Sequence, residues 1–295
     1  MTLARSSPIR MLLVFSSAVL AVVVPAAPRA LAGDTASYVA IGDSYTAGPG
    51  IPHAVPHPLG CWRSDRNYPH VVAEVRGSIL RDVSCSGATT SDLSAPQPVL
   101  GGPNPPQLDA LDTDVELVTI QIGGNDIGFA EILQRCKSVV PVGTPCRNFY
   151  TGGGTDEIRR RIIETGPKVG AVLAEARRRS PEARLLVLGY PSILPDARPG
   201  CWPVMPITPG DVPYLREKHK ELNAMLATQA AAVGATYVDL YGPSVGHDAC
   251  QLPGTRWVEP LVPVSPAAAY HPNALGMRRM AHVILTALER QDLAR

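Results

Sequence analysis

Five short apolar runs alternate with longer stretches of helical periodicity, and this alternation constrains the fold more than any other feature of the chain. The runs are residues 38–41, 82–85, 117–122, 184–188 and 236–240. Helical spacing marks residues 69–75, 158–173, 215–233 and 272–288, with Gly166 and Pro167 as a candidate break in the second stretch. Strands that alternate with helices predict an α/β fold, a five-stranded parallel sheet covered on both faces.

The first 32 residues have the pattern of a secretory signal peptide. Arg5 and Arg10 form a positive region, residues 11–24 are uncharged and mostly apolar, and Ala30 and Ala32 are small residues suited to a cleavage site. The apolar run is shorter than the roughly 18 residues of a membrane-spanning helix, so a membrane anchor is the less favoured alternative. We therefore expect a secreted, extracellular protein in which residues 33–295 form one domain.

Charge and composition narrow the possible partners. The net charge of +1 gives no argument for nucleic acid or for an anionic membrane surface. With 45% hydrophobic and 18% charged residues, the chain is typical of a globular protein and not of a disordered one. We expect a monomer with no nucleic-acid partner and no stable membrane insertion.

Six cysteines follow the predicted cleavage site, and an even number in an exported chain favours disulfides. Fifteen pairings are possible, of which we adopt the sequential one, Cys61–Cys85, Cys136–Cys146 and Cys201–Cys250. These bonds would staple long irregular segments beside the sheet. No cysteine pair has the CxxC spacing of a zinc site, so we expect no metal.

Three candidate site residues each follow a predicted strand: Ser44, Gly87 and Asn125. Ligands of parallel sheets bind beyond the carboxyl ends of the strands, so this placement predicts that the three lie together. Ser44 is the candidate nucleophile, although a serine after a strand is also a common helix N-cap. Asp43 is expected to hold the turn through local hydrogen bonds.

A serine hydroxyl needs a base to take its proton, and His271 is the preferred histidine because it comes just before the last predicted helix. The alternatives are a surface role for His271, or His247 beside Asp248 as the base. The backbone N–H groups of Ser44 and Gly87 and the side-chain amide of Asn125 would form an oxyanion hole. In isolation, a plain turn is the favoured interpretation of residues 123–126 (GGND), and Gly87 could likewise be a turn glycine.

Together these segments resemble the SGNH, or GDSL-type, hydrolase family. Block I corresponds to residues 40–45 (AIGDSY), block II to 85–90 (CSGATT), block III to 122–126 (IGGND) and block V to His271, Pro272 and Asn273 with Gly276. The cysteines and residues 60–64 (GCWRS) resemble the secreted actinobacterial lipase and esterase branch. The resemblance implies a flavodoxin-like three-layer α/β/α sandwich with ester-hydrolase activity and no cofactor or metal requirement.

One position departs from the family pattern. The family usually has an aspartate three residues before the histidine, and here that position is Ala268. A neutral imidazole still needs an acceptor for its Nδ1–H. We hypothesise a Ser44–His271 dyad in which the main-chain carbonyl of Ala268 orients the ring, with Asp248 or Glu259 as the remote carboxylates that could instead complete a triad.

The expected function is a secreted serine carboxylic-ester hydrolase, a lipase or esterase that forms an acyl-enzyme. The alternatives are a carbohydrate deacetylase or other small-acyl esterase, and a non-catalytic exported binding protein on the same fold. Lipid-type acyl esters are weakly favoured, because apolar residues follow the site glycines and could line an acyl pocket. These residues are Leu93, Val99, Leu100, Ile127 and Phe129.

Overall fold

A computed structural model describes residues 1–2 and 36–293. The cleavage site and most of the predicted signal peptide lie outside these residues, so the signal peptide stays a prediction. Among the described residues, no helix is both long and apolar enough to cross a bilayer.

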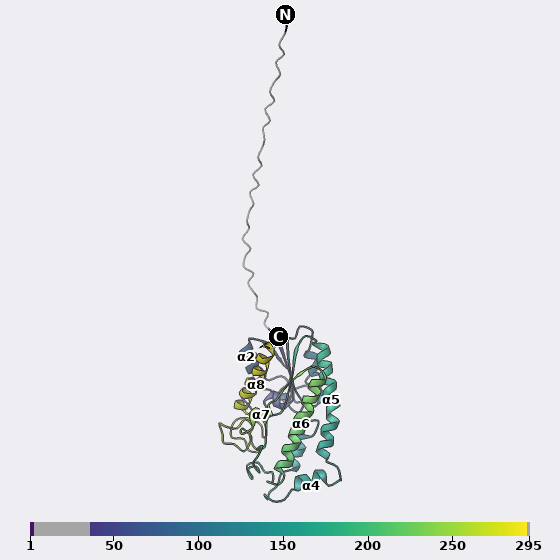
Figure 1. Ribbon diagram of the computed structural model, residues 1–295. Helices are drawn as coiled ribbons and strands as arrows, with labels where there is room; N and C mark the ends of the chain where they lie inside the picture. Colours follow the sequence, from purple (N-terminus) through teal and green to yellow (C-terminus); the bar gives the residue numbers. More distant parts are fainter. Residues whose placement is uncertain (3–35, 294–295) are drawn as a thin grey trace. The chain divides into compact units, whose positions relative to one another are not determined.

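The centre of the fold is a five-stranded, all-parallel sheet, as predicted (Figure 1). Its strands are β1 (Ser37–Gly42), β2 (Ile79–Asp82), β3 (Leu117–Gln121), β4 (Arg184–Leu188) and β5 (Thr236–Val238). They lie in the order β2-β1-β3-β4-β5. β1 thus lies between the edge strand β2 and β3, and the sheet continues from β3 to β5 on the other side.

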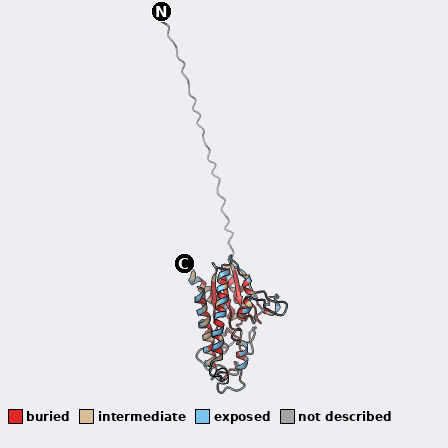
Figure 2. Ribbon diagram, turned by 90° about the vertical axis from the view of Figure 1, so that its right-hand side faces the viewer, coloured by how far each residue is buried: buried red, intermediate tan, exposed pale blue. Residues whose placement is uncertain are grey.

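Helices cover both faces of the sheet, and alternating side chains on each strand explain why. Tyr38 and Ala40 of β1 pack in one apolar cluster with α2 (Tyr68–Arg76) and α8 (Ala274–Leu293). Val39 and Ile41 point the other way, into a cluster with α5 (Glu157–Arg179) and α6 (Val212–Ala232). Figure 2 shows the buried strands between helices that are exposed on their outer sides. The three-layer sandwich implied by the family resemblance is therefore present.

Short helices occupy the connections. They are α1 (Ser44–Ala47), α3 (Phe129–Arg135), α4 (Pro145–Thr151) and α7 (Tyr241–Ser244), with 3₁₀ turns η1 (Leu59–Cys61), η2 (Thr90–Leu93) and η3 (Gln107–Ala110). All of these follow the carboxyl end of a strand, where the long irregular segments lie. The sheet is thus regular, and the site end of the molecule is built mostly from loops.

Two expectations differ from the structure. The second strand is residues 79–82 rather than 82–85, because an edge strand with alternating exposure lacks a continuous apolar run. Val83 and Cys85 nevertheless continue to donate backbone hydrogen bonds to β1. Helix α5 is unbroken at Pro167. The carbonyl that loses its helical partner belongs to Ile163, which is exposed, so that water can satisfy it.

Three disulfides join Cys61 to Cys85, Cys136 to Cys146 and Cys201 to Cys250, the pairs given by sequential pairing. The first links the segment after β1 to that after β2, and the third links the segment after β4 to that after β5. No cysteine is free. The disulfides thus connect loops at one end of the sheet and leave the helical layers uncrosslinked.

Candidate active site

Ser44 lies at the first turn of α1, directly beyond the carboxyl end of β1. Asp43 is the N-cap of this helix, and its carboxylate accepts a hydrogen bond from the backbone N–H of Tyr45 (2.8 Å). The N-cap role considered for Ser44 therefore belongs to Asp43, and the Ser44 hydroxyl is left for another partner. Gly42 is required before this turn, because a Cβ there would lie 2.2 Å from Thr46 Oγ1.

The buried side chain of Gln107, in η3 between β2 and β3, holds the backbone of the turn at Gly42. Its Oε1 accepts from the N–H of Gly42 (2.8 Å) and its Nε2 donates to the carbonyl of the same residue (3.0 Å). Sequence reasoning missed Gln107, since no local pattern links it to a glycine 65 residues earlier. Its two hydrogen bonds fix the backbone from which Ser44 projects.

The structure brings His271 to Ser44 across 227 residues. His271 Nε2 lies 2.8 Å from Ser44 Oγ, and Nδ1 lies 2.7 Å from the carbonyl oxygen of Ala269. Because a carbonyl only accepts, Nδ1 carries the proton and Nε2 is free to accept one from the serine. The carbonyl predicted for this role, that of Ala268, instead accepts from the backbone N–H of His271 (3.2 Å).

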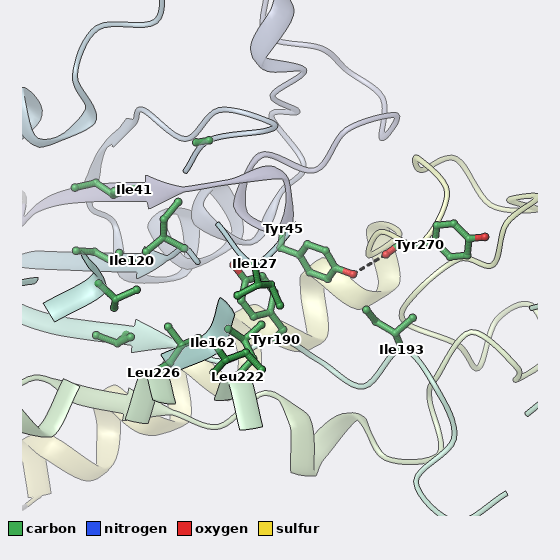
Figure 3. Packing of buried hydrophobic residues seen from close by; sticks show 14 of the residues in the cluster. Ile41, Tyr45, Ile120, Ile127, Ile162, Tyr190, Ile193, Leu222, Leu226 and Tyr270 are labelled. Atoms are coloured by element: carbon green, nitrogen blue, oxygen red, sulfur yellow. Dashed lines mark hydrogen bonds between the residues drawn. The ribbon is translucent and has the colours of Figure 1, made fainter. Parts of the chain in front are cut away.

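The shift from Ala268 to Ala269 follows from the backbone between them and the ring. Tyr270 has a φ of 64°, the left-handed region that non-glycine residues rarely adopt. Its carbonyl accepts a hydrogen bond from the Tyr45 hydroxyl at 2.6 Å (Figure 3). The tight turn at Tyr270 brings the nearer carbonyl, that of Ala269, under Nδ1. Tyr45, next to the candidate nucleophile, thereby also holds the histidine loop.

Neither remote carboxylate accepts from the histidine ring. Asp248 accepts from the backbone N–H of Cys250 and from the side chain of Gln251. Buried Glu259 is bonded to Arg256 and to the amide of Asn273. Within residues 36–293, the only recorded acceptor for Nδ1 of His271 is the Ala269 carbonyl.

The competing base, His247, has a different setting. Its Nδ1 lies 2.7 Å from the carbonyl of Thr255, and its ring stacks on Trp257 with the centroids 5.1 Å apart. These contacts make His247 part of the packing of the loop that follows β5, and it does not contact Ser44. Burial lowers the pKa of His271 below its ordinary value, and the hydrogen bond to Ala269 partly opposes this. A neutral imidazole, the form that can accept a proton, is thus favoured near pH 7.

Besides Ser44 on α1, the two other candidate oxyanion-hole residues, Gly87 and Asn125, lie on two loops that are bonded to each other. Asn125 Nδ2 donates to the carbonyl of Ala88 (2.8 Å), which leaves its second amide proton for a ligand. The Asp126 carboxylate accepts from the N–H and hydroxyl of Thr90. Gly87 has a φ of 81°, the left-handed region that glycine adopts readily, and a Cβ there would find its first neighbour, Gln97 Nε2, 3.8 Å away.

A buried network that sequence reasoning missed connects the serine turn to the Asn125 loop. The Tyr190 hydroxyl donates to Asp43 Oδ2 (2.6 Å) and accepts from the N–H of Gly124 (2.9 Å). The Tyr190 ring packs edge-on against Tyr45 (Figure 3). Burial raises the pKa of Asp43 to about 7, while the hydrogen bond from Tyr190 opposes this rise. A tyrosine after the fourth strand carries no sequence pattern that would have revealed this role.

A pocket of about 810 Å³, counting its open mouth, adjoins these groups. Ser44 and Asn125 lie on its wall, which is otherwise mostly apolar. Ile127 and Phe129 line it as predicted, together with residues of α3, α5, α6 and the segment after β4. The other three residues of the expected lining do not: Leu93 is in the core, Val99 packs against the core and Leu100 is exposed. In the part of the chain that the structure describes, no group of His, Cys, Asp or Glu could hold a metal ion.

Comparison with known proteins identifies the family. The model of the GDSL-like lipase/acylhydrolase family matches residues 40–279. The chain belongs to this family. This GDSL-like hydrolase is 45% identical to Lipase 2 of Streptomyces coelicolor over 263 residues, which cover 87% of this chain and 86% of the relative. It is 30% identical to a lipase of Streptomyces rimosus, with 86% and 85% covered.

Solved structures agree with this assignment. The phospholipase A1 of Streptomyces albidoflavus NA297 superposes with a TM-score of 0.72 and 26% identity, covering 85% of this chain and 99% of that one. The extracellular lipase of Streptomyces rimosus gives a TM-score of 0.70 and 27% identity over the same shares. The GDSL-like hydrolase is therefore a carboxylic-ester hydrolase with the fold of this family.

Proposed function

We propose that this hydrolase is a secreted serine lipase or esterase that cleaves lipid-type acyl esters through a Ser44–His271 dyad. The observation that carries the proposal is the 2.8 Å contact between Ser44 Oγ and a histidine nitrogen whose ring partner is a carbonyl. This arrangement supplies a nucleophile and a base. The Ala269 carbonyl holds the imidazole in the tautomer whose Nε2 can accept the serine proton, and within residues 36–293 no other acceptor competes for the Nδ1 proton.

The reaction divides into two half-reactions. Ser44 Oγ attacks the ester carbonyl while His271 Nε2 takes its proton, and the oxyanion accepts hydrogen bonds from Ser44 N–H, Gly87 N–H and the Asn125 amide. His271 then returns the proton to the leaving alcohol, which leaves an acyl-serine. Water, deprotonated by the same nitrogen, attacks the acyl carbonyl, and Ser44 recovers its proton as the acid departs.

An apolar acyl group suits the site. The pocket that begins at Ser44 and Asn125 is lined mainly by aliphatic and aromatic side chains, the kind of wall that buries an apolar ligand. The two Streptomyces relatives compared above are named lipases, and one structural neighbour is a phospholipase A1. Three disulfides with no free cysteine support secretion, because such bonds persist in oxidising compartments.

The test measures kcat/KM of the purified protein on p-nitrophenyl esters from acetate to palmitate, with a phospholipid and acetylated xylan in parallel. We expect higher kcat/KM on medium or long acyl chains than on acetate, and little release of acetate from xylan. An alkyl phosphonate should modify Ser44 alone, as detected by peptide mass spectrometry.

Two variants serve as controls for the site. Ser44→Ala should abolish turnover, and Asn125→Ala should lower kcat by about 10²–10³-fold, the typical loss for one oxyanion donor. Full activity of the Ser44→Ala variant would refute the assignment of the nucleophile. A preference for acetylated xylan would instead favour a carbohydrate deacetylase.

A further inference from the structure

Most of the large apolar side chains that the structure describes as exposed lie in segments beyond the carboxyl ends of the strands. The densest group is in the loop closed by the Cys136–Cys146 disulfide, called here the valine loop. Val139, Val140 and Val142 in this loop are 92%, 51% and 67% exposed. Single exposed apolar residues are common, but three within four residues form a patch that needs an explanation.

Two further exposed apolar residues adjoin the valine loop. Phe149, on α4 just after the loop, is 53% exposed, and Val204 is 50% exposed. The segment of Val204 is joined to the loop by hydrogen bonds from Ser138 N to the Pro206 carbonyl (2.8 Å) and from Trp202 Nε1 to the Ser138 carbonyl (3.1 Å). The disulfide and these bonds hold the apolar side chains outward on an ordered support.

The patch lies at the same end of the molecule as the candidate active site. The valine loop follows α3, which starts directly after the loop of Asn125 and contributes Ile132 and Leu133 to the pocket wall. In Figure 1, α4 lies at the tip of the molecule, beyond the ends of α5 and α6. A flat surface that met this tip would therefore also approach the end of the sheet that carries the candidate active site.

Positively charged side chains predominate around the patch. No Asp or Glu occurs between Glu131 and Asp156, whereas Arg135, Lys137 and Arg147 all lie in this interval. Among the described residues none of the three forms an ion pair. Arg135 lies over the Phe149 ring and Lys137 contacts Gln134, while Glu131, whose pKa Arg135 helps to lower, is paired with Arg161. The surface arginines of α5 differ, because Arg159, Arg160 and Arg178 each pair with a glutamate.

One carboxylate lies beneath the patch. Asp211 is buried, and its oxygens accept from the backbone N–H groups of Cys146 and Arg147 and from the Thr208 hydroxyl. It anchors the base of α4 through backbone N–H groups and forms no ion pair with the three cations. The net charge of +1 for the whole chain therefore conceals a local positive surface with an apolar tip.

We infer that the valine loop, with Phe149 and Val204, is a docking surface for an anionic lipid interface. The valines insert among acyl chains, and Arg135, Lys137 and Arg147 contact the negatively charged headgroups. This inference rests on the proposed function, because it identifies how a lipase reaches substrates that are presented in an aggregate. It requires no conformational change of the active site.

The experiment uses the purified protein carrying Ser44→Ala, so that the lipid is not hydrolysed, and measures its co-sedimentation with phosphatidylglycerol and phosphatidylcholine vesicles. We expect binding to phosphatidylglycerol that weakens with salt. The triple variant Val139→Ser, Val140→Ser, Val142→Ser should bind at least ~10-fold more weakly, because apolar burial drives insertion. Lys137→Gln with Arg147→Gln should lose the preference for the anionic vesicles.

Matched controls are Val75→Ser and Ile163→Ser, which replace side chains that are 65% and 66% exposed on α2 and α5. They should bind like the parent. Vesicle binding that is unchanged in the triple valine variant, or absent in the parent, would overturn the inference. With Ser44 restored, the triple variant should hydrolyse a soluble butyrate ester like the wild type. Failure of the wild type on that ester would refute the proposed function separately.

Discussion

At the residue scale, two tyrosines organise the candidate site although neither is a candidate for chemistry. Tyr45 joins the serine turn to the histidine loop through the carbonyl of Tyr270. Tyr190 joins the same turn to the Asn125 loop through Asp43 and Gly124. Three segments distant in sequence are thus held together by two hydroxyl groups in a low-dielectric setting, where each hydrogen bond is costly to lose.

Tyr190→Phe tests this positioning role. The change leaves the buried N–H of Gly124 without its acceptor and removes a donor from Asp43, so we expect kcat to fall about tenfold with KM for a soluble ester unchanged. Because Tyr190 opposes the rise in the pKa of Asp43, the variant should keep Asp43 protonated to higher pH and alter the pH profile of kcat above about pH 7.

A suitable control for Tyr190→Phe is Tyr237→Phe, since no hydrogen bond of the Tyr237 hydroxyl is recorded within residues 36–293. It should leave kcat and its pH profile like those of the wild type. Equal losses of activity in the two variants would show that Tyr190 acts through general packing only.

Ala268→Asp tests how the histidine is oriented. The structure supplies a neutral carbonyl to Nδ1 of His271, so a carboxylate placed three residues before the ring should leave kcat intact or raise it modestly. Burial now lowers the pKa of His271, and a nearby negative charge would raise it. The acid limb of kcat/KM, where the base is lost by protonation, should move to higher pH in the variant. A large fall in kcat at pH 8 would contradict this expectation.

At the element scale, the strands and helices were largely readable from the sequence, because buried central strands are continuous apolar runs and covering helices have one apolar stripe. β4 has the predicted bounds, β1 extends one residue further at each end, β3 ends one residue earlier and β5 ends two residues earlier than predicted. The edge strand β2 was misplaced because its side chains alternate in exposure. Contacts that depend on tertiary packing, such as those of Gln107 and Tyr190, have no local pattern and could not be predicted.

Leu215→Phe tests the contribution of α6 to the acyl pocket. Leu215 lines the pocket beside residues of α5 and is 7% exposed. A larger ring should narrow the space for long acyl chains and leave attack on short esters unaffected. We expect kcat/KM on palmitate esters to fall about tenfold or more relative to acetate, the acetate rate being the internal control. A uniform loss across chain lengths would show that the residue does not contact the acyl group.

At the scale of the whole molecule, the fold separates a stable body from a crosslinked site end. The two apolar clusters lie on the two faces of the sheet, and the disulfides lie in the connections beyond its carboxyl edge. The division was partly predictable, since the cysteines fall in irregular segments. The direction of each loop, and hence the open mouth of the pocket, depends on packing that no pattern in the sequence encodes.

Removal of individual disulfides tests this division. Cys201 and Cys250 are 49 residues apart, whereas Cys136 and Cys146 are 10 apart. In the chain-entropy account, Cys201→Ser with Cys250→Ser should lower the unfolding free energy by about 4 kcal/mol, and the equivalent 136–146 variant by about 3 kcal/mol. Urea unfolding under oxidising conditions measures both. The reverse order of the two losses would indicate that local packing outweighs loop closure.

The carbonyl that faces the imidazole has a consequence for tolerance to mutation. Every amino acid brings the same oxygen to the chain, so no single codon change at position 269 can delete the acceptor, whereas a side-chain aspartate is lost by one substitution. In a saturation library selected for ester hydrolysis, positions 268 and 269 should accept many residues. Position 270 should be restrictive, since its left-handed backbone aims that oxygen at the ring.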